Sequence, residues 1–241
     1  NYIMNKIKNI YSALFLAVIL FSGGGHAAVG QILPETEGLW EYTGLISSQG
    51  ESLPLTGIFL IKDGVFLQQS IFNGDVFSEQ GSMAHVGTCW AGGAGLRLTS
   101  NQTLSMSPVD NKRLISMGTM EHDLKVTRDG DDLTLVFGAG TSTIQTLKKI
   151  NDASDTRIYP FTDGSLALVN NYFILVTGNA EGAVTGFGKY TQAGNALTLN
   201  VIRWAQSSEE TTVNSKGAIL KASFDGTIFS LPDGKSFTLV Q

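Results

Sequence analysis

The sequence predicts an all-β fold made of two tandem antiparallel barrel or meander units, and three observations support it. Glycine is abundant at 28 residues, proline is scarce at 5, and only 15% of residues are charged, a composition typical of many short strands joined by tight turns. No segment after Ala28 shows a sustained helical period, whereas apolar and polar residues alternate in several stretches. One series of landmarks also occurs twice in the chain, which indicates an internal duplication.

The duplicated landmarks keep the same order and nearly the same spacing in both copies. The first copy contains Asp63-Gly64, Gly87, Leu96-Arg97-Leu98 and Asp129-Gly130. The second contains Asp163-Gly164, Gly188, Leu197-Thr198-Leu199 and Asp225-Gly226. Asp-Gly is a common hairpin turn, so each match alone is weak, but four matches in order favour duplication.

Residues 1–27 have the features of a signal peptide. Lys6 and Lys8 precede an apolar run over residues 13–21, and small residues at Gly25 and Ala27 suit cleavage after Ala27. The apolar run is shorter than the roughly 20 residues that a transmembrane helix needs. We therefore expect a periplasmic or secreted protein that is not inserted in the membrane after cleavage.

Strands are expected along the whole remaining chain. In the first unit, residues 28–150, they fall at 38–48, 56–62, 65–72, 81–90, 94–100, 118–127, 132–138 and 142–148. In the second unit, residues 151–241, they fall at 165–170, 172–177, 183–190, 196–204, 217–224, 227–231 and 236–240. The polar stretch from Asn151 to Asp155 has no apolar period and marks the boundary between the units.

Charge and cysteine content exclude several classes of function. The 16 basic residues are outnumbered by 21 acidic ones and form no clusters, so we expect no nucleic-acid partner. The one cysteine, Cys89, forms no intramolecular disulfide. The short paired spacings of structural zinc sites are missing from the sequence, and we expect neither a metal nor a cofactor.

Alternation predicts which side chains face the interior. In the segment 83–90 one face carries His85 and Cys89, and the other carries Trp90. In the segment 120–126, His122 shares its face with apolar residues, while Glu121 and Asp123 point to solvent. Both histidines are therefore expected to lie on an apolar interior face.

The motif Gly38-Leu39-Trp40, the Asp-Gly hairpins, a later Gly-x-Tyr/Trp and the Leu-x-Leu strands resemble the lipocalin-like (calycin) family of antiparallel barrels. The resemblance implies that Trp40 lies across the closed end of a barrel whose apolar cavity opens at the other end. The family also has an arginine beside this tryptophan, and Arg203 is the nearest candidate. The second copy lacks its own Gly-x-Trp.

Six residues are candidate ligand-binding residues: Trp40, His85, Cys89, Trp90, His122 and Arg203. The histidines can line a cavity or be hydrogen-bonded core residues. The tryptophans can form a ligand wall or a core plug, and Cys89 is better explained as a small buried thiol than as a nucleophile. Arg203 continues the i, i+2 series of Leu197, Leu199 and Val201, which places its charge on the apolar face.

The sequence thus favours an exported protein that binds an apolar small molecule in a β-barrel cavity. One alternative is a cofactor-free cyclase or isomerase acting on an apolar substrate, although no catalytic set is identifiable. The other is an envelope or surface interaction module, for which exposed strand edges would suffice. Whether the copies form two barrels or halves of one, and in which oligomeric state, stays open.

Overall fold

The computed structural model describes residues 33–72, 76–93, 95–138, 142–179, 181–208 and 211–240. The prediction of an all-β fold is confirmed for these residues, which form strands and short 3₁₀ turns. The turns are η1 (Pro34–Thr36), η2 (Phe77–Glu79) and η3 (Pro108–Asp110). The predicted signal peptide, residues 1–27, lies outside the described residues.

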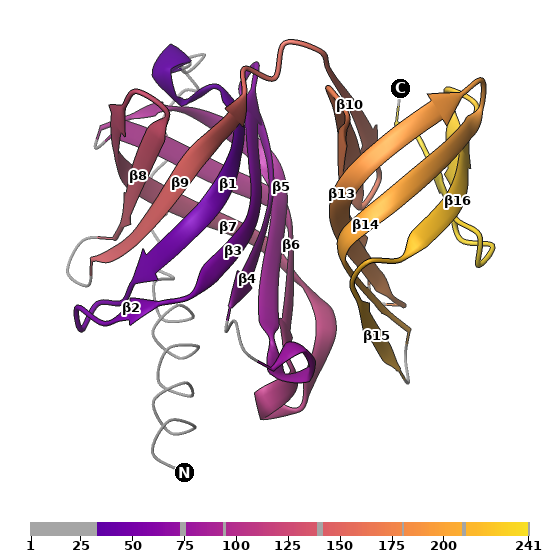
Figure 1. The fold of residues 1–241 in the computed structure, drawn as a ribbon, viewed down its shortest axis with the longest axis horizontal. Coiled ribbons are helices and arrows are strands. Elements are labelled where there is room, and N and C mark those ends of the chain that lie inside the picture. The colour runs from indigo at the N-terminus through magenta and orange to yellow at the C-terminus, as the bar shows by residue number, and fades with distance from the viewer. Residues whose placement is uncertain are drawn as a thin grey trace.

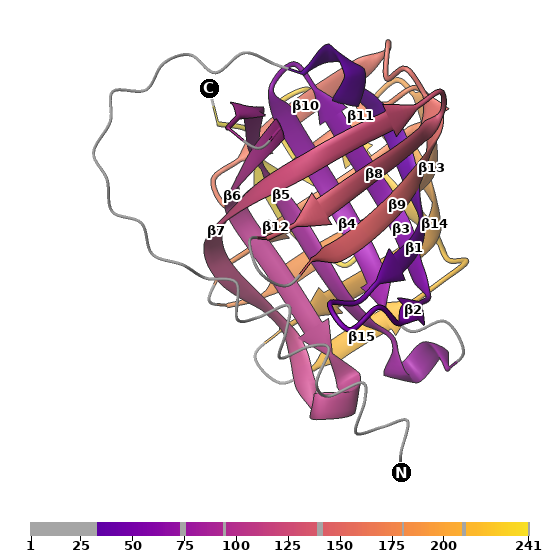
Figure 2. The ribbon, with the colours of Figure 1, turned by 90° about the vertical axis from the view of Figure 1, so that its left-hand side faces the viewer.

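The first sheet closes on itself as an up-and-down barrel (Figures 1 and 2). Its strands are β1 (Gly38–Ile46), β2 (Ser52–Leu53), β3 (Leu55–Lys62), β4 (Val65–Phe72), β5 (Gly81–Gly92), β6 (Gly95–Ser107), β7 (Lys112–Asp129), β8 (Asp132–Phe137) and β9 (Thr143–Asn151). The two-residue β2 pairs only with β1, and the other eight strands follow chain order until β9 pairs with β1. Closure leaves this sheet without a free edge among its long strands.

The second sheet repeats this meander but closes incompletely. Its strands are β10 (Thr156–Phe161), β11 (Gly164–Val169), β12 (Tyr172–Gly178), β13 (Ala183–Ala193), β14 (Ala196–Ser207), β15 (Thr212–Ser215), β16 (Ile219–Phe224), β17 (Ile228–Ser230) and β18 (Ser236–Thr238). One isolated bridge, between Phe161 and Leu239, joins the β10 end to the residue after β18. The result is a half-barrel whose concave side has a hydrophobic core of its own.

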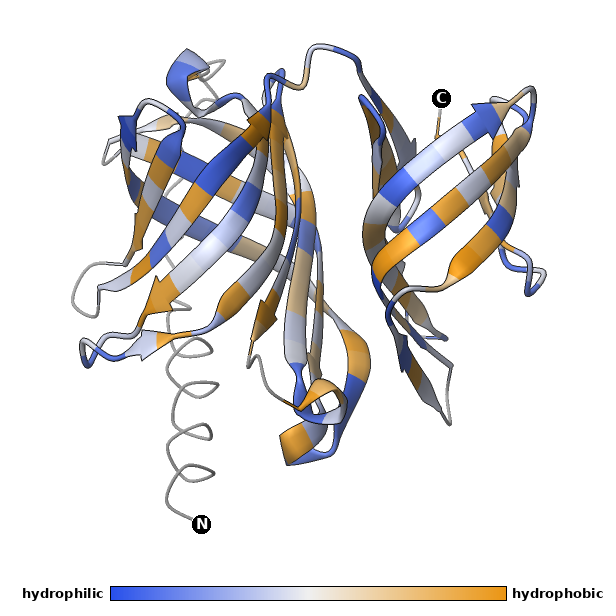
Figure 3. Cartoon of the chain, in the orientation of Figure 1, coloured by the Kyte–Doolittle hydropathy of each residue, from blue (hydrophilic) through white to orange (hydrophobic). Residues whose placement is uncertain are grey.

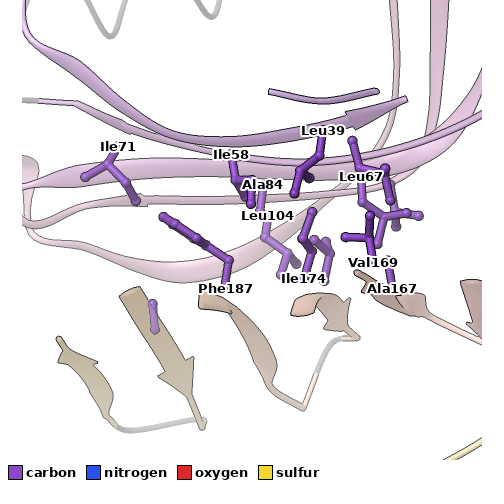
Figure 4. Close-up of a cluster of buried hydrophobic side chains, with 14 of the residues drawn as sticks. Leu39, Ile58, Leu67, Ile71, Ala84, Leu104, Ala167, Val169, Ile174 and Phe187 are labelled. Atoms are coloured by element: carbon purple, nitrogen blue, oxygen red, sulfur yellow. The ribbon is translucent and has the colours of Figure 1, made fainter. Parts of the chain in front are cut away.

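The outer face of the barrel packs against the convex face of the half-barrel. Side chains of β3 to β6 meet those of β11 to β13 in a shared cluster, where Leu67 and Leu104 lie opposite Ile174 and Phe187 (Figure 4). Apolar and polar residues alternate along the strands on both sides (Figure 3), and several strands are buried on both faces. The barrel interior, this interface and the half-barrel interior are three separate clusters.

A β-bulge occurs at the same place in both units. Pairing between β5 and β6 shifts register at Val86/Gly87, leaving Asn101 as the extra residue, and pairing between β13 and β14 shifts at Phe187/Gly188. Both glycines are required sterically. A Cβ atom on Gly87 would lie 2.0 Å from the Thr99 carbonyl oxygen, and one on Gly188 would lie 2.2 Å from that of Asn200.

Three of the four repeated landmarks occupy corresponding places in the two sheets. The exception is Asp163-Gly164, which joins β10 to β11, whereas Asp63-Gly64 joins β3 to β4. In the second sheet, the turn Asn170-Asn171 occupies the place of Asp63-Gly64. The same hydrogen bond shows this equivalence, because the backbone N–H of Cys89 donates to Gly64 O and the backbone N–H of Tyr190 donates to Asn171 O, each at 2.8 Å.

The strand predictions agree with the structure in most places, but the expected strands 94–100 and 118–127 are shorter than β6 and β7, and three short strands were missed. The missed ones are β2, β15 and β10. β10 comes directly after the boundary at Asn151 to Asp155, and it contains Pro160, which provides no N–H for a ladder and is tolerated because the strand lies at a sheet edge.

Candidate functional site

The candidate site is the interior of the barrel, which is closed at one end by Trp40. This side chain is fully buried, and its Nε1 donates to the carbonyl oxygen of Thr36 in η1 at 2.9 Å. The guanidinium of Arg128 lies over the indole, 5.6 Å from the ring centroid, and donates to Glu35 O at 3.0 Å. The arginine beside Trp40 is therefore Arg128, and the suggestion that Arg203 fills this place is wrong.

An apolar layer fills the barrel next to Trp40. It includes Phe59, Phe66, Leu124 and Leu133, each no more than 1% exposed. The rings of Phe59 and Phe66 meet edge to face with centroids 5.9 Å apart. This layer is solidly packed, so a ligand must enter from the opposite end.

Further from Trp40, polar side chains replace apolar ones on the inward face. The bulge at Asn101 turns both Ser100 and Thr103 towards His85, whose Nδ1 lies 3.2 Å from Ser100 Oγ and 3.1 Å from Thr103 Oγ1. Ser100 Oγ also lies within hydrogen-bond distance of Met120 O, at 3.2 Å. If that contact uses the hydroxyl proton, Ser100 accepts from Nδ1–H and His85 is the Nδ1–H tautomer.

His122 comes from β7 and faces His85 across the interior. The two imidazole centroids are 5.9 Å apart, and His122 also meets Phe137 edge to face at 5.6 Å. Burial lowers the pKa of His85 to about 3, with the neighbouring His122 as a smaller cause. Burial likewise lowers the pKa of His122, so both rings are neutral at physiological pH.

Two glutamines and a tyrosine complete this group, and sequence reasoning missed them. Tyr42 donates its hydroxyl proton to Gln68 Oε1 at 2.6 Å, and Gln68 pairs with His85 across β4 and β5. Gln145 lies opposite Leu135 on β8 and is 5% exposed. Gln68 could have been found as a polar residue in the i, i+2 series that includes Phe66 and Phe72, whereas Gln145 shares its parity with Thr143 and Lys149 and has no such signal. We call Tyr42, Gln68, His85, His122 and Gln145 the polar belt.

Several inward side chains away from Trp40 are only partly buried. Met83, Met120, His122 and Phe137 point inward, yet each is half-buried rather than buried. Inward side chains of a closed barrel reach solvent only through its interior, because the strands cover them from outside. The half with the polar belt thus holds most of the partly buried inward side chains, although Leu45, Leu55 and Phe72 in the same half are buried.

Cys89 lies in the wall of the apolar layer and has no feature of a nucleophile. It is 3% exposed, and burial raises the pKa of its thiol to about 12. Nucleophilic cysteines instead have a lowered pKa and partial exposure. Neither Cys89 nor His85 is thus suited to proton transfer or covalent catalysis near neutral pH.

The structure places Trp90 outside the barrel, on the face opposite to His85 and Cys89. It is half-buried and pairs across β5 and β6 with Arg97, which forms a bidentate ion pair with Asp123 at 2.7 and 2.8 Å. Trp90 does not line the cavity with the other candidates.

Arg203 also lies outside both interiors, and its predicted face is wrong. Ile202 is the extra residue of the second bulge, so the i, i+2 series that includes Val201 ends there and Arg203 turns towards the barrel. Its Nη1 donates to Gln80 Oε1 at 2.7 Å and its Cζ lies 4.3 Å from the Phe77 ring centroid. Burial lowers the pKa of Arg203 to about 10.

The half-barrel offers a different kind of cavity. A cleft of about 490 Å³ opens at one end, between Phe161, Thr177, Ser207 and Phe237. Its buried hydroxyl is already engaged, since Ser207 Oγ donates to Leu114 O at 2.7 Å and accepts from Ala183 N at 3.3 Å. We therefore regard the barrel interior, towards which the polar belt converges, as the better candidate.

Among the described residues, no group of three or more His, Cys, Asp or Glu side chains could hold a metal ion. In the same residues no helix has the length and hydropathy to span a bilayer. Comparisons with protein-family models, with curated proteins and with solved structures give no match that would place the chain in a family.

Proposed function

We propose that this protein is an exported, lipocalin-like protein that binds an apolar small molecule inside the β1 to β9 barrel. The observation that carries the proposal is the gradient along the barrel axis. Trp40 and the apolar layer plug one end, whereas the inward side chains at the other end, Met83 and Phe137 among them, are half-buried. A one-ended apolar pocket with a few convergent polar groups is the usual form of a small-molecule site.

We further infer that the two units arose by duplication and then diverged. The corresponding bulges, with Gly87 and Gly188 at the same place, support this origin. The first unit carries polar side chains on its inward face, whereas Leu175 and Val201 occupy the equivalent positions of the half-barrel. The half-barrel therefore serves as a support that covers β4 to β6 from outside through the shared interface cluster.

Binding is better supported than the cyclase or isomerase alternative. Burial lowers the pKa of His85 and raises the pKa of Cys89, so neither group changes its protonation state near pH 7, as a general acid–base or nucleophilic residue would need to. Arg203 is held at the interface between the units and cannot donate to a substrate in the barrel. No specific observation favours a surface interaction module.

The proposal is tested with an uncharged apolar dye, Nile red, in a variant that keeps Trp40 as its one tryptophan. Trp90→Phe and Trp204→Phe remove the other two, so energy transfer from Trp40 reports dye inside the barrel. We expect saturable transfer with one dye per chain. Dye fluorescence that never saturates, or that leaves Trp40 emission unchanged, would overturn the proposal.

A further inference from the structure

The inward polar groups of the barrel are uncharged, and from this we infer that the ligand is an uncharged amphiphile. It has an apolar body and one hydrogen-bonding group, such as a hydroxyl or amide, and its ionised carboxylate analogue is excluded. This inference rests on the proposed function, because it names the ligand class of the same site. It depends on charge placement, hydrogen-bond capacity and packing.

Charged side chains with inward parity lie only at the plugged end, among the described residues. Arg128 is over the Trp40 ring, and Lys149 Nζ is 5.8 Å from that ring's centroid. Both are engaged elsewhere, Arg128 with Glu35 O and Gly130 O, and Lys149 with Asp152. Trp40 and the packed apolar layer separate them from the polar belt.

An ionised ligand would therefore lose its hydration without gaining an opposite charge. The cationic Arg97 and the anionic Asp123 pair with each other on the outer face. His85 does not substitute as a cation, because it is buried beside a second imidazole, and both features lower its pKa. Burying an isolated charge is much costlier than burying a neutral polar group that finds a hydrogen bond.

A neutral group does find partners at the polar belt. Gln145 Oε1 is buried and has no hydrogen-bond donor among the described residues, and an acceptor left in this state costs stability. A hydroxyl or amide N–H of the ligand can donate a hydrogen bond to Gln145 Oε1. Because the layer beyond the belt is filled by Phe59 and Phe66, the polar group enters first and the apolar body extends towards Met83 and Phe137.

Decan-1-ol, decanoate and decylammonium share a chain length and differ in charge, so they test the inference by competition with Nile red at pH 7.5. We expect decanol to bind at least roughly tenfold more tightly than either ion, a gap that corresponds to about 1.4 kcal/mol. If Nile red binds and decanoate competes as well as decanol, this inference fails while the proposed function stands. If Nile red does not bind, the proposed function itself fails.

Two substitutions connect the selectivity to the polar belt. Gln145→Leu removes the unpaired acceptor and should reduce the affinity for decanol several-fold while sparing Nile red. The matched control is Gln192→Leu on the exposed part of β13, which should change the affinity for neither compound.

Gln145→Lys places a cation in the interior and should reverse the order of the affinities for decanol and decanoate. Unchanged selectivity in both Gln145 variants, each shown to be folded by circular dichroism, would contradict the assigned role of the polar belt.

Discussion

The two units share a strand order and a bulge, but their interiors differ at several equivalent positions around that bulge. In the barrel, His85 pairs with Thr103 across β5 and β6, whereas the half-barrel has Gly186 opposite Trp204 across β13 and β14. A Cβ on Gly186 would lie 2.3 Å from the Trp204 ring. The indole thus occupies the space that an imidazole would need.

The same replacement extends to the neighbouring strands. By pairing register, Leu175, Val201 and Leu220 are the equivalents of Gln68, Ser100 and His122 respectively. Polar groups in one unit are apolar in the other, although the backbone course is alike. The backbone therefore fixes where inward side chains point, and the side chains decide whether the space is a pocket or a core.

The largest expected effect on stability is at Trp204, which fills the interior of the half-barrel and which we call its plug. Trp204→Ala should lower the free energy of unfolding by about 3 to 5 kcal/mol, because it leaves a large cavity in a packed interior. Trp204 is 5% exposed. The matched control is Trp90→Ala, whose half-buried side chain should contribute less. Urea denaturation measures the free energy of unfolding of both variants. Equal losses of stability would contradict the view that Trp204 fills an interior while Trp90 lies on an outer face.

Transferring the plug to the barrel should abolish ligand binding. The double variant His85→Gly with Thr103→Trp reproduces the Gly186 and Trp204 pair, and we expect Nile red affinity to fall at least about 100-fold, which corresponds to roughly 2.7 kcal/mol. Fluorescence titration gives the affinity, and a cooperative thermal transition shows that the variant is folded. Parent-like affinity in a folded variant would exclude the barrel interior as the site.

Acidification should destabilise the barrel through its histidines. The pKa of His85 is lowered to about 3 from 6.5, so between these values the unfolded chain binds a proton that the folded barrel does not. Stability then falls as pH falls below 6.5, by about 1.4 kcal/mol per pH unit for one such group, and His122 acts in the same direction.

Urea denaturation at pH 6.5 and 5.0 measures this slope, in a range above the usual titration of carboxylates. His85→Gln keeps a polar side chain and should remove most of the pH dependence of the free energy of unfolding. A variant that retains the parent slope would show that His85 is already able to ionise in the folded barrel.

The smallest effect is expected at Arg203, which strand alternation alone assigns to the apolar face. Arg203→Met should leave Nile red affinity within about twofold and change stability by about 1 kcal/mol or less, because replacing a buried charge by an apolar side chain of similar volume is often close to neutral. Its donated bond goes to Gln80. A large loss of affinity would restore Arg203 as a ligand-binding residue.

Most of the fold, but only part of the site, could be predicted from the sequence. Alternation placed His85, Cys89 and His122 on the inward face, because side chains in a regular strand change face at every residue. It failed at Arg203, where one extra residue in a bulge reverses the parity of the rest of the strand. The glycines that mark both bulges are recognisable as repeated landmarks, but their steric reason lies in the facing strand.

The sequence by itself determined the strands, their antiparallel succession and the inward parity of regular segments, because these depend on local alternation and turn residues. Only the tertiary structure decided that Arg128 covers Trp40, that Ser100 and Thr103 both reach His85, and that Trp204 fills the second interior. Those contacts depend on sheet closure and register, which bring together residues distant in the chain.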